Sequence, residues 1–151
     1  IGDGNNMCNS LLVGCLTLGM HISIANPEGY KPPAYYVNKG NELAIKNGVS
    51  FFMTKSPEEA VKDADVVITD VWASMGQEKE AAERMKAFKG YQVNKELMIL
   101  AKNDAIVLHC LPAHREEEIT EEILEANADT IFEEAENRLH AQKAILVKLL
   151  S

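Results

Sequence analysis

Four short polar segments carry the side chains that could do chemistry, and each follows a run of apolar residues. They supply a carboxylate at Asp70, a hydroxyl at Ser74, a thiol at Cys110, a guanidinium at Arg138 and a side-chain amide at Asn6. In an open parallel sheet, ligands bind beyond the carboxyl ends of the strands. We therefore expect these groups to converge on one rim of such a sheet, although they are far apart in sequence. The segments are Asp3–Asn6, Asp70–Gly76, His109–Pro112 and Glu136–Arg138.

The position of Arg138 indicates that the ligand is an anion. It is expected at the start of a helix over Glu134–Leu150, where the helix dipole disfavours a cation. An arginine at this position makes better sense if an anion lies between it and the helix N-terminus.

Each segment also has a purely structural interpretation. The Gly2–Asn6 segment could be only a turn and a helix cap, and Asp70 could be a capping or loop residue. Cys110 could be a small buried hydrophobe, the commoner fate of a free cysteine. Cys8 and Cys15, seven residues apart on a helical face, are predicted to be core residues. For Asp70 and Cys110 the residues alone leave both interpretations open.

The elements that must position these groups alternate along the chain. Short apolar runs rich in Ile, Val or Phe are typical of strands covered on both faces. The predicted strands are Met20–Ala25, Ser50–Met53, Asp65–Thr69, Ala105–His109 and Thr130–Phe132. The predicted helices are Asn6–Leu18, ended by Gly19, one that begins after the capping pattern Ser56-Pro57-Glu58-Glu59, and Glu134–Leu150.

This alternation predicts an α/β fold, a three-layer sandwich with a Rossmann-like, mostly parallel sheet and helices on both faces. The 151 residues fit one domain, residues 1–151. Ile1-Gly2-Asp3-Gly4 resembles a strand end that runs into a turn and a helix, so we expect the first strand to be truncated and the chain to be a fragment.

Composition narrows the function classes. The net charge is −8 and no Lys/Arg block is present, which argues against nucleic acid as a partner. No apolar run approaches the ~20 residues that span a bilayer, so no membrane association is expected. Three cysteines without a CxxC pair indicate neither a disulfide framework nor a zinc site, and a cytoplasmic setting is the simplest.

The motifs in these segments resemble a known family, the ornithine carbamoyltransferases. Ser-Met-Gly and His-Cys-Leu-Pro together are specific for the ornithine branch, because the aspartate carbamoyltransferase relatives carry other residues in these loops. The Ser-x-Arg-Thr-Arg phosphate motif of the family's N-terminal domain is absent here, and Glu116 stands where many members have glycine. The segments that resemble the family, in order and spacing, are Gly2–Asn6, Asp70–Glu78, Gly90–Asn94, His109–Pro112 and Glu134–Arg138.

The resemblance implies the aspartate/ornithine carbamoyltransferase fold and a set of roles. The α-amino and α-carboxylate groups of L-ornithine would be held by Asn6, Asp70, Ser74 and the Met75 backbone. Cys110 would face the δ-amine, the Leu111 backbone would lie near the carbamoyl carbonyl, and Arg138 would reach carbamoyl phosphate. The catalytic residues implied are Cys110, Arg138 and Asp70. The family also implies a homotrimer or a higher oligomer for the full-length protein.

The chemistry of carbamoyl transfer agrees with these roles. A primary amine with a pKa of ~10 is protonated and inert at neutral pH, so its proton must be removed. A cysteine can assist if nearby charges lower its pKa. Asp70 suits an ammonium group, and Arg138 can stabilise negative charge on phosphate or a developing oxyanion. The reaction needs no metal or cofactor, and neither is expected.

Two other hypotheses compete. A nicotinamide-dependent dehydrogenase domain is suggested by Gly2-Asp3-Gly4, but Met7 stands where its fingerprint needs glycine or alanine. A binding module without catalysis of its own is suggested by the absent phosphate motif, because carbamoyl phosphate would have too few partners. We therefore expect the isolated chain to be inactive.

Overall fold

The computed structural model describes residues 1–74 and 76–151. Four of the five predicted strands are found, each beginning one or two residues later than expected, and the helices that begin at Asn6 and after Ser56 are also confirmed. The elements in chain order are α1 (Asn6–Thr17), β1 (Ile22–Ala25), α2 (Ala34–Asn47), β2 (Phe51–Thr54), α3 (Pro57–Val61), β3 (Val66–Thr69), a 3-10 turn η1 (Glu78–Glu80), α4 (Ala81–Ala87), α5 (Lys95–Met98), β4 (Ile106–His109), α6 (Glu121–Ala126) and α7 (Ala128–Leu150).

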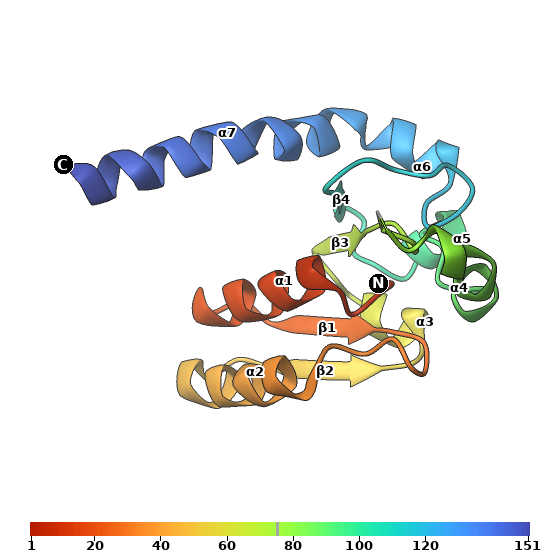
Figure 1. Cartoon of the computed structure of the whole chain (residues 1–151), viewed down its shortest axis with the longest axis horizontal. Coiled ribbons are helices and arrows are strands. Elements are labelled where there is room, and N and C mark those ends of the chain that lie inside the picture. Colours follow the sequence, from red (N-terminus) through yellow and green to blue (C-terminus); the bar gives the residue numbers. More distant parts are fainter. Residues whose placement is uncertain (75) are drawn as a thin grey trace.

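The strands form two parallel pairs, β1 with β2 and β3 with β4. The first two residues of the chain connect the pairs. The Ile1 ammonium donates to the Ile68 carbonyl at 2.8 Å, and the Gly2 N–H donates to the Ala25 carbonyl at 3.1 Å. Ile1 and Gly2 thus lie between β1 and β3 and bond to both, where the N-terminus is marked in Figure 1.

Helices cover both faces of this arrangement. Neighbouring strand residues point to opposite faces, and in β1 these are Ile24 and Ala25, both buried. Ile24 belongs to a core cluster with side chains of α1 and α2, whereas Ala25 packs with Ala60 of α3 and with Phe88, which follows α4. The predicted α/β class with parallel strands and helices on both faces is therefore confirmed.

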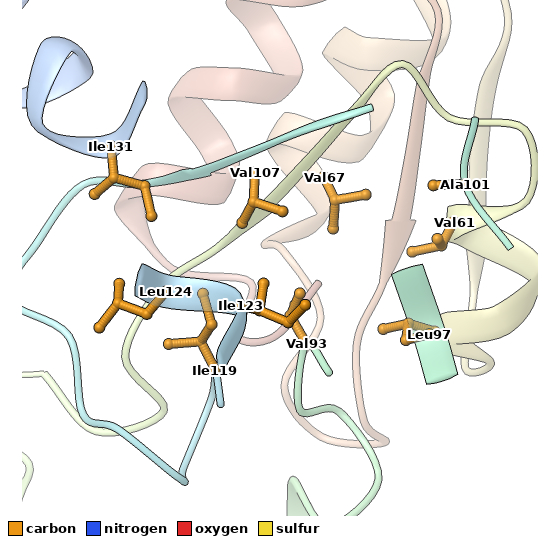
Figure 2. Close-up of a cluster of buried hydrophobic side chains, with 10 residues drawn as sticks. All are labelled: Val61, Val67, Val93, Leu97, Ala101, Val107, Ile119, Ile123, Leu124 and Ile131. Carbon is orange, nitrogen blue, oxygen red and sulfur yellow. The ribbon is translucent and has the colours of Figure 1, made fainter. Parts of the chain in front are cut away.

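The largest apolar cluster lies around β3 and β4. Val67 and Val107 project from the two strands toward side chains of α5, α6 and α7 (Figure 2). Ile119 and Ile131 are fully buried in the same cluster. This core holds the carboxyl end of β4, and with it the segment that carries Cys110.

The segment 130–132 corrects the sequence prediction. The predicted strand Thr130–Phe132 lies inside α7, which begins at Ala128. Side chains satisfy the outer edge of β4 in its place, because Asn127 Oδ1 accepts from the Val107 N–H at 3.3 Å and Glu134 Oε2 accepts from the His109 N–H at 2.9 Å. Three β-prone residues, flanked by Asp129 and Glu133, are too few to override the helix propensity of the surrounding residues.

The second half of α7 extends away from the rest of the chain (Figure 1), and its residues 136–150 are exposed. No helix in the described part of the chain is both long enough and apolar enough to cross a membrane. The exposed residues nevertheless include several large apolar side chains, namely Leu139, Ile145, Leu146, Val147, Leu149 and Leu150.

Candidate functional site

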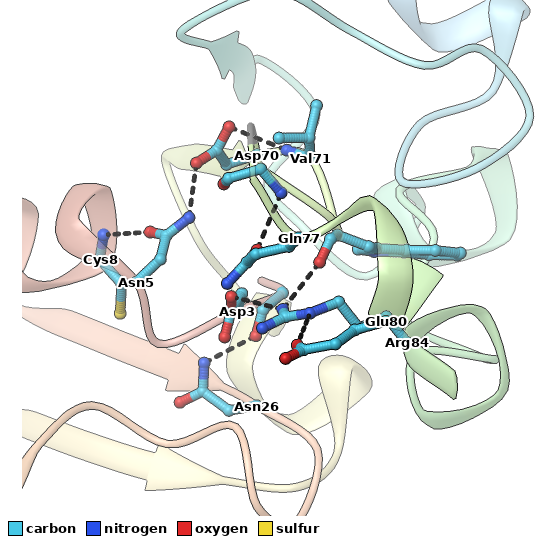
Figure 3. Close-up of polar contacts among 12 residues, drawn as sticks. Asp3, Asn5, Cys8, Asn26, Asp70, Val71, Gln77, Glu80 and Arg84 are labelled. Carbon is cyan, nitrogen blue, oxygen red and sulfur yellow. Dashed lines mark hydrogen bonds and ion pairs between the residues drawn. The ribbon is translucent and has the colours of Figure 1, made fainter. Parts of the chain in front are cut away.

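Asp70 joins three of the four polar segments at one rim, and Figure 3 shows its bonds to Asn5 and Val71. Its Oδ2 accepts from Asn5 Nδ2 at 2.8 Å, and its Oδ1 accepts from the Val71 N–H at 2.8 Å and from the Cys110 thiol at 3.2 Å. Asn5 follows the first two residues, Asp70 follows β3 and Cys110 follows β4. The predicted convergence of these segments at the carboxyl ends of the parallel strands is therefore confirmed.

The Cys110 thiol differs from the sequence expectation, which required nearby charges that lower its pKa. The pKa of Cys110 is raised to about 12, first by burial and then by the hydrogen bond to Asp70 and the negative charges of Asp70 and Glu134. Burial also raises the pKa of Glu134, which the hydrogen bond from the His109 backbone partly offsets. Without a ligand, Cys110 is thus a neutral donor to Asp70 and not a thiolate.

The neighbouring asparagines Asn5 and Asn6 have different roles. Asn5 is the N-cap of α1, because its Oδ1 accepts from the backbone N–H groups of Met7 and Cys8 while its Nδ2 binds Asp70. Both ends of its amide are therefore used. Asn6 is the first residue of α1 and is exposed. Of the two amides, that of Asn6 is the one placed to meet a ligand.

The loop after β3 is bound by Arg84, a residue that the sequence reasoning missed. Arg84 is buried and donates to Asp3 Oδ2 at 2.8 Å (Figure 3). It also donates to the Trp72 carbonyl at 2.9 Å, and its guanidinium lies over the Tyr30 ring. It links the turn that carries Asn5 to the loop that carries Ser74.

The predicted site residues in this loop are only partly described. Ser74 is half-buried, and its backbone N–H donates to Gln77 Oε1 at 2.9 Å. Met75 lies outside the described residues. The hydroxyl of Ser74 is therefore the group that this part of the loop would offer to a ligand.

Leu111 follows Cys110 with a backbone that leucine rarely adopts, at φ 54°. Its N–H donates to His109 Nδ1 at 2.9 Å. Because that donor is used, the Leu111 carbonyl oxygen is the backbone group that it could present to a ligand. The Leu111–Pro112 bond is cis.

Arg138 does not lie where the sequence predicted. It is the eleventh residue of α7 and exposed, so the argument from a helix N-terminus was wrong. It lies one turn after Glu134 and therefore on the same helix face. Glu134 reaches the end of β4, so Arg138 continues that face beyond the edge of the sheet. The structure thus does not bring Arg138 together with Asp70 and Cys110 through any contact that it shows.

One group of potential metal ligands was not expected from the sequence. The ligand atoms of His114, Glu117 and Glu118 lie within 4.8 Å of one another. Glu118 already accepts from the His109 ring and from the His114 N–H, at 3.0 and 2.7 Å. We assign no metal to this group.

Single residues without a motif gave no signal for the contacts that the sequence reasoning missed. Arg84 lies in a helix rich in charges, and Glu118 ends an acidic run that is typical of a solvated loop. Their burial depends on partners 81 and nine residues away, respectively. The burial of a charged residue can be predicted only when its partner is known.

Comparisons with known proteins agree with this geometry. The family described as "Aspartate/ornithine carbamoyltransferase, Asp/Orn binding domain" matches residues 1–149. An ornithine carbamoyltransferase of Carboxydothermus hydrogenoformans is 53% identical over 150 residues, covering 99% of this chain and 48% of that protein. A catabolic ornithine carbamoyltransferase of Thermoplasma volcanium is 50% identical, covering 100% of this chain and 50% of that protein.

Solved structures show the same likeness. The anabolic ornithine carbamoyltransferase of Campylobacter jejuni superposes with a TM-score of 0.94 at 47% identity, covering 98% of this chain and 49% of that one. The chain therefore spans about half the length of the relatives that it matches.

The fold and the rim define an α/β domain whose candidate ligand site lies at the carboxyl ends of parallel strands. The chain belongs to the aspartate/ornithine carbamoyltransferase family, in which it corresponds to the Asp/Orn-binding domain. The alternative of a nicotinamide-dependent dehydrogenase is not supported, because the family match covers residues 1–149, including the Gly2-Asp3-Gly4 turn that suggested it.

Proposed function

We propose that this chain is the C-terminal, ornithine-binding half of an ornithine carbamoyltransferase. That enzyme transfers the carbamoyl group of carbamoyl phosphate to the δ-amine of L-ornithine and releases L-citrulline and phosphate. The observation that carries the proposal is the Asp70 carboxylate held between the Asn5 amide and the Cys110 thiol. The names of relatives that are about half identical to this chain support it.

In this proposal Asp70 binds the α-ammonium group of ornithine. Its three hydrogen bonds fix its orientation before a ligand arrives, which reduces the entropy lost on binding. The exposed Asn6 amide donates to the α-carboxylate, and the Ser74 hydroxyl and the Met75 backbone add short-range hydrogen bonds. A carboxylate opposite an ammonium and an amide opposite a carboxylate select a zwitterionic amino acid.

Cys110 would face the δ-amine. Because the pKa of its thiol is about 12 in the free chain, Cys110 cannot begin as the base. An ammonium group that pairs with Asp70 would offset the negative charge that raises this pKa. Ornithine would thereby lower the pKa of Cys110 as it binds. Once the thiol has lost its proton to solvent, the thiolate would accept the proton of the δ-ammonium group.

Leu111 and Arg138 would serve the second substrate. Since the Leu111 N–H is taken by His109, its carbonyl oxygen is suited to accept from the carbamoyl NH2 group and not to donate to the carbamoyl oxygen. Arg138, beyond the edge of the sheet, would reach carbamoyl phosphate bound to the other half of the enzyme, and would stabilise the charge of the leaving phosphate.

The exposed apolar side of α7 fits this division into two halves. Large exposed apolar patches mark surfaces that bind another protein part, and the relatives are about twice as long as this chain. We infer that the apolar side chains of residues 139–150 pack against the carbamoyl-phosphate-binding half. The isolated chain would then be inactive, and the complete enzyme a homotrimer or a higher oligomer.

Its cellular setting follows the same proposal. The three cysteines are free, which suits a reducing cytoplasm. The reaction needs no cofactor. Relatives named anabolic and catabolic are both about half identical to this chain, and the same site would serve arginine synthesis, including a urea cycle, or arginine breakdown.

A substrate comparison tests the proposal. The two-domain enzyme is given carbamoyl phosphate with L-ornithine, L-aspartate or N-acetyl-L-ornithine, and the carbamoylated product is measured. Only ornithine should react well, because acetylation removes the charge that Asp70 binds and aspartate has no δ-amine. Faster carbamoylation of aspartate or of acetylornithine would show that the assigned substrate is wrong.

A further inference from the structure

One buried imidazole holds the segment that carries Cys110 and Leu111. The Leu111 N–H donates to His109 Nδ1 at 2.9 Å, although Leu111 has the unfavourable φ of 54°. Because Nδ1 accepts this bond, it carries no proton, and the ring proton lies on Nε2. The hydrogen bond thus fixes both the Leu111 backbone and the tautomer of the ring.

Glu118 fixes the other side of the ring. His109 Nε2 lies 3.0 Å from Glu118 Oε1, which also accepts from the His114 N–H at 2.7 Å. Both side chains of the pair are fully buried. The Glu118 backbone is held in turn, because its carbonyl accepts from the Val93 N–H at 2.8 Å. The pair therefore connects the loop after β4 to the buried core.

This arrangement is unfavourable as a source of stability. Glu118 Oε2 is buried, and it has no hydrogen-bond partner among the described residues. A buried polar atom without a partner lowers stability, and buried charged pairs are often no better for stability than apolar side chains of the same volume. Holding one backbone geometry is a function that apolar side chains could not perform.

We propose that His109 and Glu118 are positioning residues for carbamoyl transfer. Glu118 holds the tautomer and orientation of His109, and His109 Nδ1 holds the Leu111 backbone so that its carbonyl faces the carbamoyl group. This rests on the proposed function. Neither residue contacts Asp70 or Asn6 through any bond that the structure shows, so the pair serves the carbamoyl side of the reaction and not ornithine binding.

Two substitutions of His109 separate its two hydrogen bonds. In His109→Asn, the amide oxygen takes the place of Nδ1 and keeps an acceptor for the Leu111 N–H, while the contact with Glu118 is lost. In His109→Gln, the longer side chain keeps a donor near Glu118 but removes the acceptor for Leu111. Both replace the ring by an amide, so each is the control for the other.

Steady-state kinetics of citrulline formation in the two-domain enzyme give the test. We expect His109→Gln to lower kcat about 100-fold, as a displacement of about 1 Å at a reacting group does, and His109→Asn to lower it at least tenfold less. The KM for ornithine should stay within about threefold in both. Equal losses of kcat in the two variants, or a KM for ornithine that rises as much as kcat falls, would overturn the proposal.

A measurement on the unmodified enzyme does not depend on how the variants fold. Nitrogen-15 NMR of the histidine rings should show His109 with an unprotonated Nδ1 and a protonated Nε2, and a proton on Nδ1 would contradict the proposal. Failure of the proposed function is seen separately, because the wild-type enzyme would then form no citrulline while the His109 spectrum would still report the hydrogen bond.

Discussion

The clearest consequence of the site geometry concerns the reactivity of Cys110. Only the thiolate reacts with an alkylating reagent such as iodoacetamide. With a pKa of about 12 in place of the ordinary 9.0, roughly one Cys110 in 10⁴ is a thiolate at pH 8, compared with about one in ten for a free thiol. Cys110 should therefore react about a thousandfold more slowly than a free thiol, before any steric effect.

Asp70→Asn removes the charge that raises this pKa but leaves the burial, which is the larger cause. We expect it to restore at least one of the three pKa units and to speed alkylation of Cys110 at least about tenfold, since each unit is a factor of ten in thiolate. Glu134→Gln removes a weaker charge and keeps the acceptor for the His109 N–H, so it should give a smaller acceleration.

The assay is peptide mapping by mass spectrometry after timed alkylation of the chain. Cys8 is an internal control, because burial raises its pKa to about 11 and Asp70 is not among the causes. In the Asp70→Asn variant the new amide would place an N–H against Asn5 Nδ2, at a loss of roughly 1–2 kcal/mol, so thermal unfolding is followed in parallel. Unchanged Cys110 rates in a folded Asp70→Asn variant, or equal acceleration of Cys8, would refute the electrostatic explanation.

Three further predictions concern stability and dynamics. Gly4→Ala should destabilise the chain by roughly 3 kcal/mol in urea unfolding, because a Cβ would lie 2.3 Å from Pro32 N, whereas Gly14→Ala, in open space within α1, should stabilise it by about 0.5–1 kcal/mol; similar effects of the two would be inconsistent with the packing. Since the pKa of Cys110 is higher in the folded than in the unfolded chain, its stabilising contribution is complete below pH 9 and is lost as the pH rises toward 12, so Cys110→Ser should show a shallower loss of stability over that range. Backbone amides of residues 139–150 should exchange with deuterium much faster in this chain than those around Ile131, because an unpacked helix end is only marginally stable; equal protection would show that the end of α7 is packed.

Much of the fold was predictable because its signals are local. The apolar runs that form β1 to β4, and the Ser56-Pro57 start of α3, depend on neighbouring residues alone. The run at 130–132 failed because its outcome depends on Asn127 and Glu134, whose side chains take the hydrogen bonds at the edge of β4. The three residues of the run give no sign that side chains outside it take these hydrogen bonds in place of a fifth strand.

The site was predictable as a convergence of segments but not as a set of contacts. Topology alone brings Asp70 and Cys110 to one rim. The direction of the Cys110 pKa shift could not be predicted, because it depends first on the burial of the thiol and then on its distance of 3.2 Å to Asp70. The conformation of Glu116 was not predictable from the sequence either. Its φ of 66° explains why a glycine suits this position, and its side chain accepts a hydrogen bond from the Glu121 N–H.

The central claim is that the Asp70 carboxylate binds the ammonium group of ornithine in a carbamoyltransferase. Its most direct test is kcat/KM for ornithine in citrulline formation by the two-domain enzyme, with Asp70→Ala compared with Asp65→Ala. Asp65 is a matched control at the other end of β3, where it forms an exposed ion pair with Lys102. We predict a fall of roughly a hundred- to a thousandfold for Asp70→Ala and less than about twofold for Asp65→Ala. Wild-type-like turnover in Asp70→Ala would contradict the account.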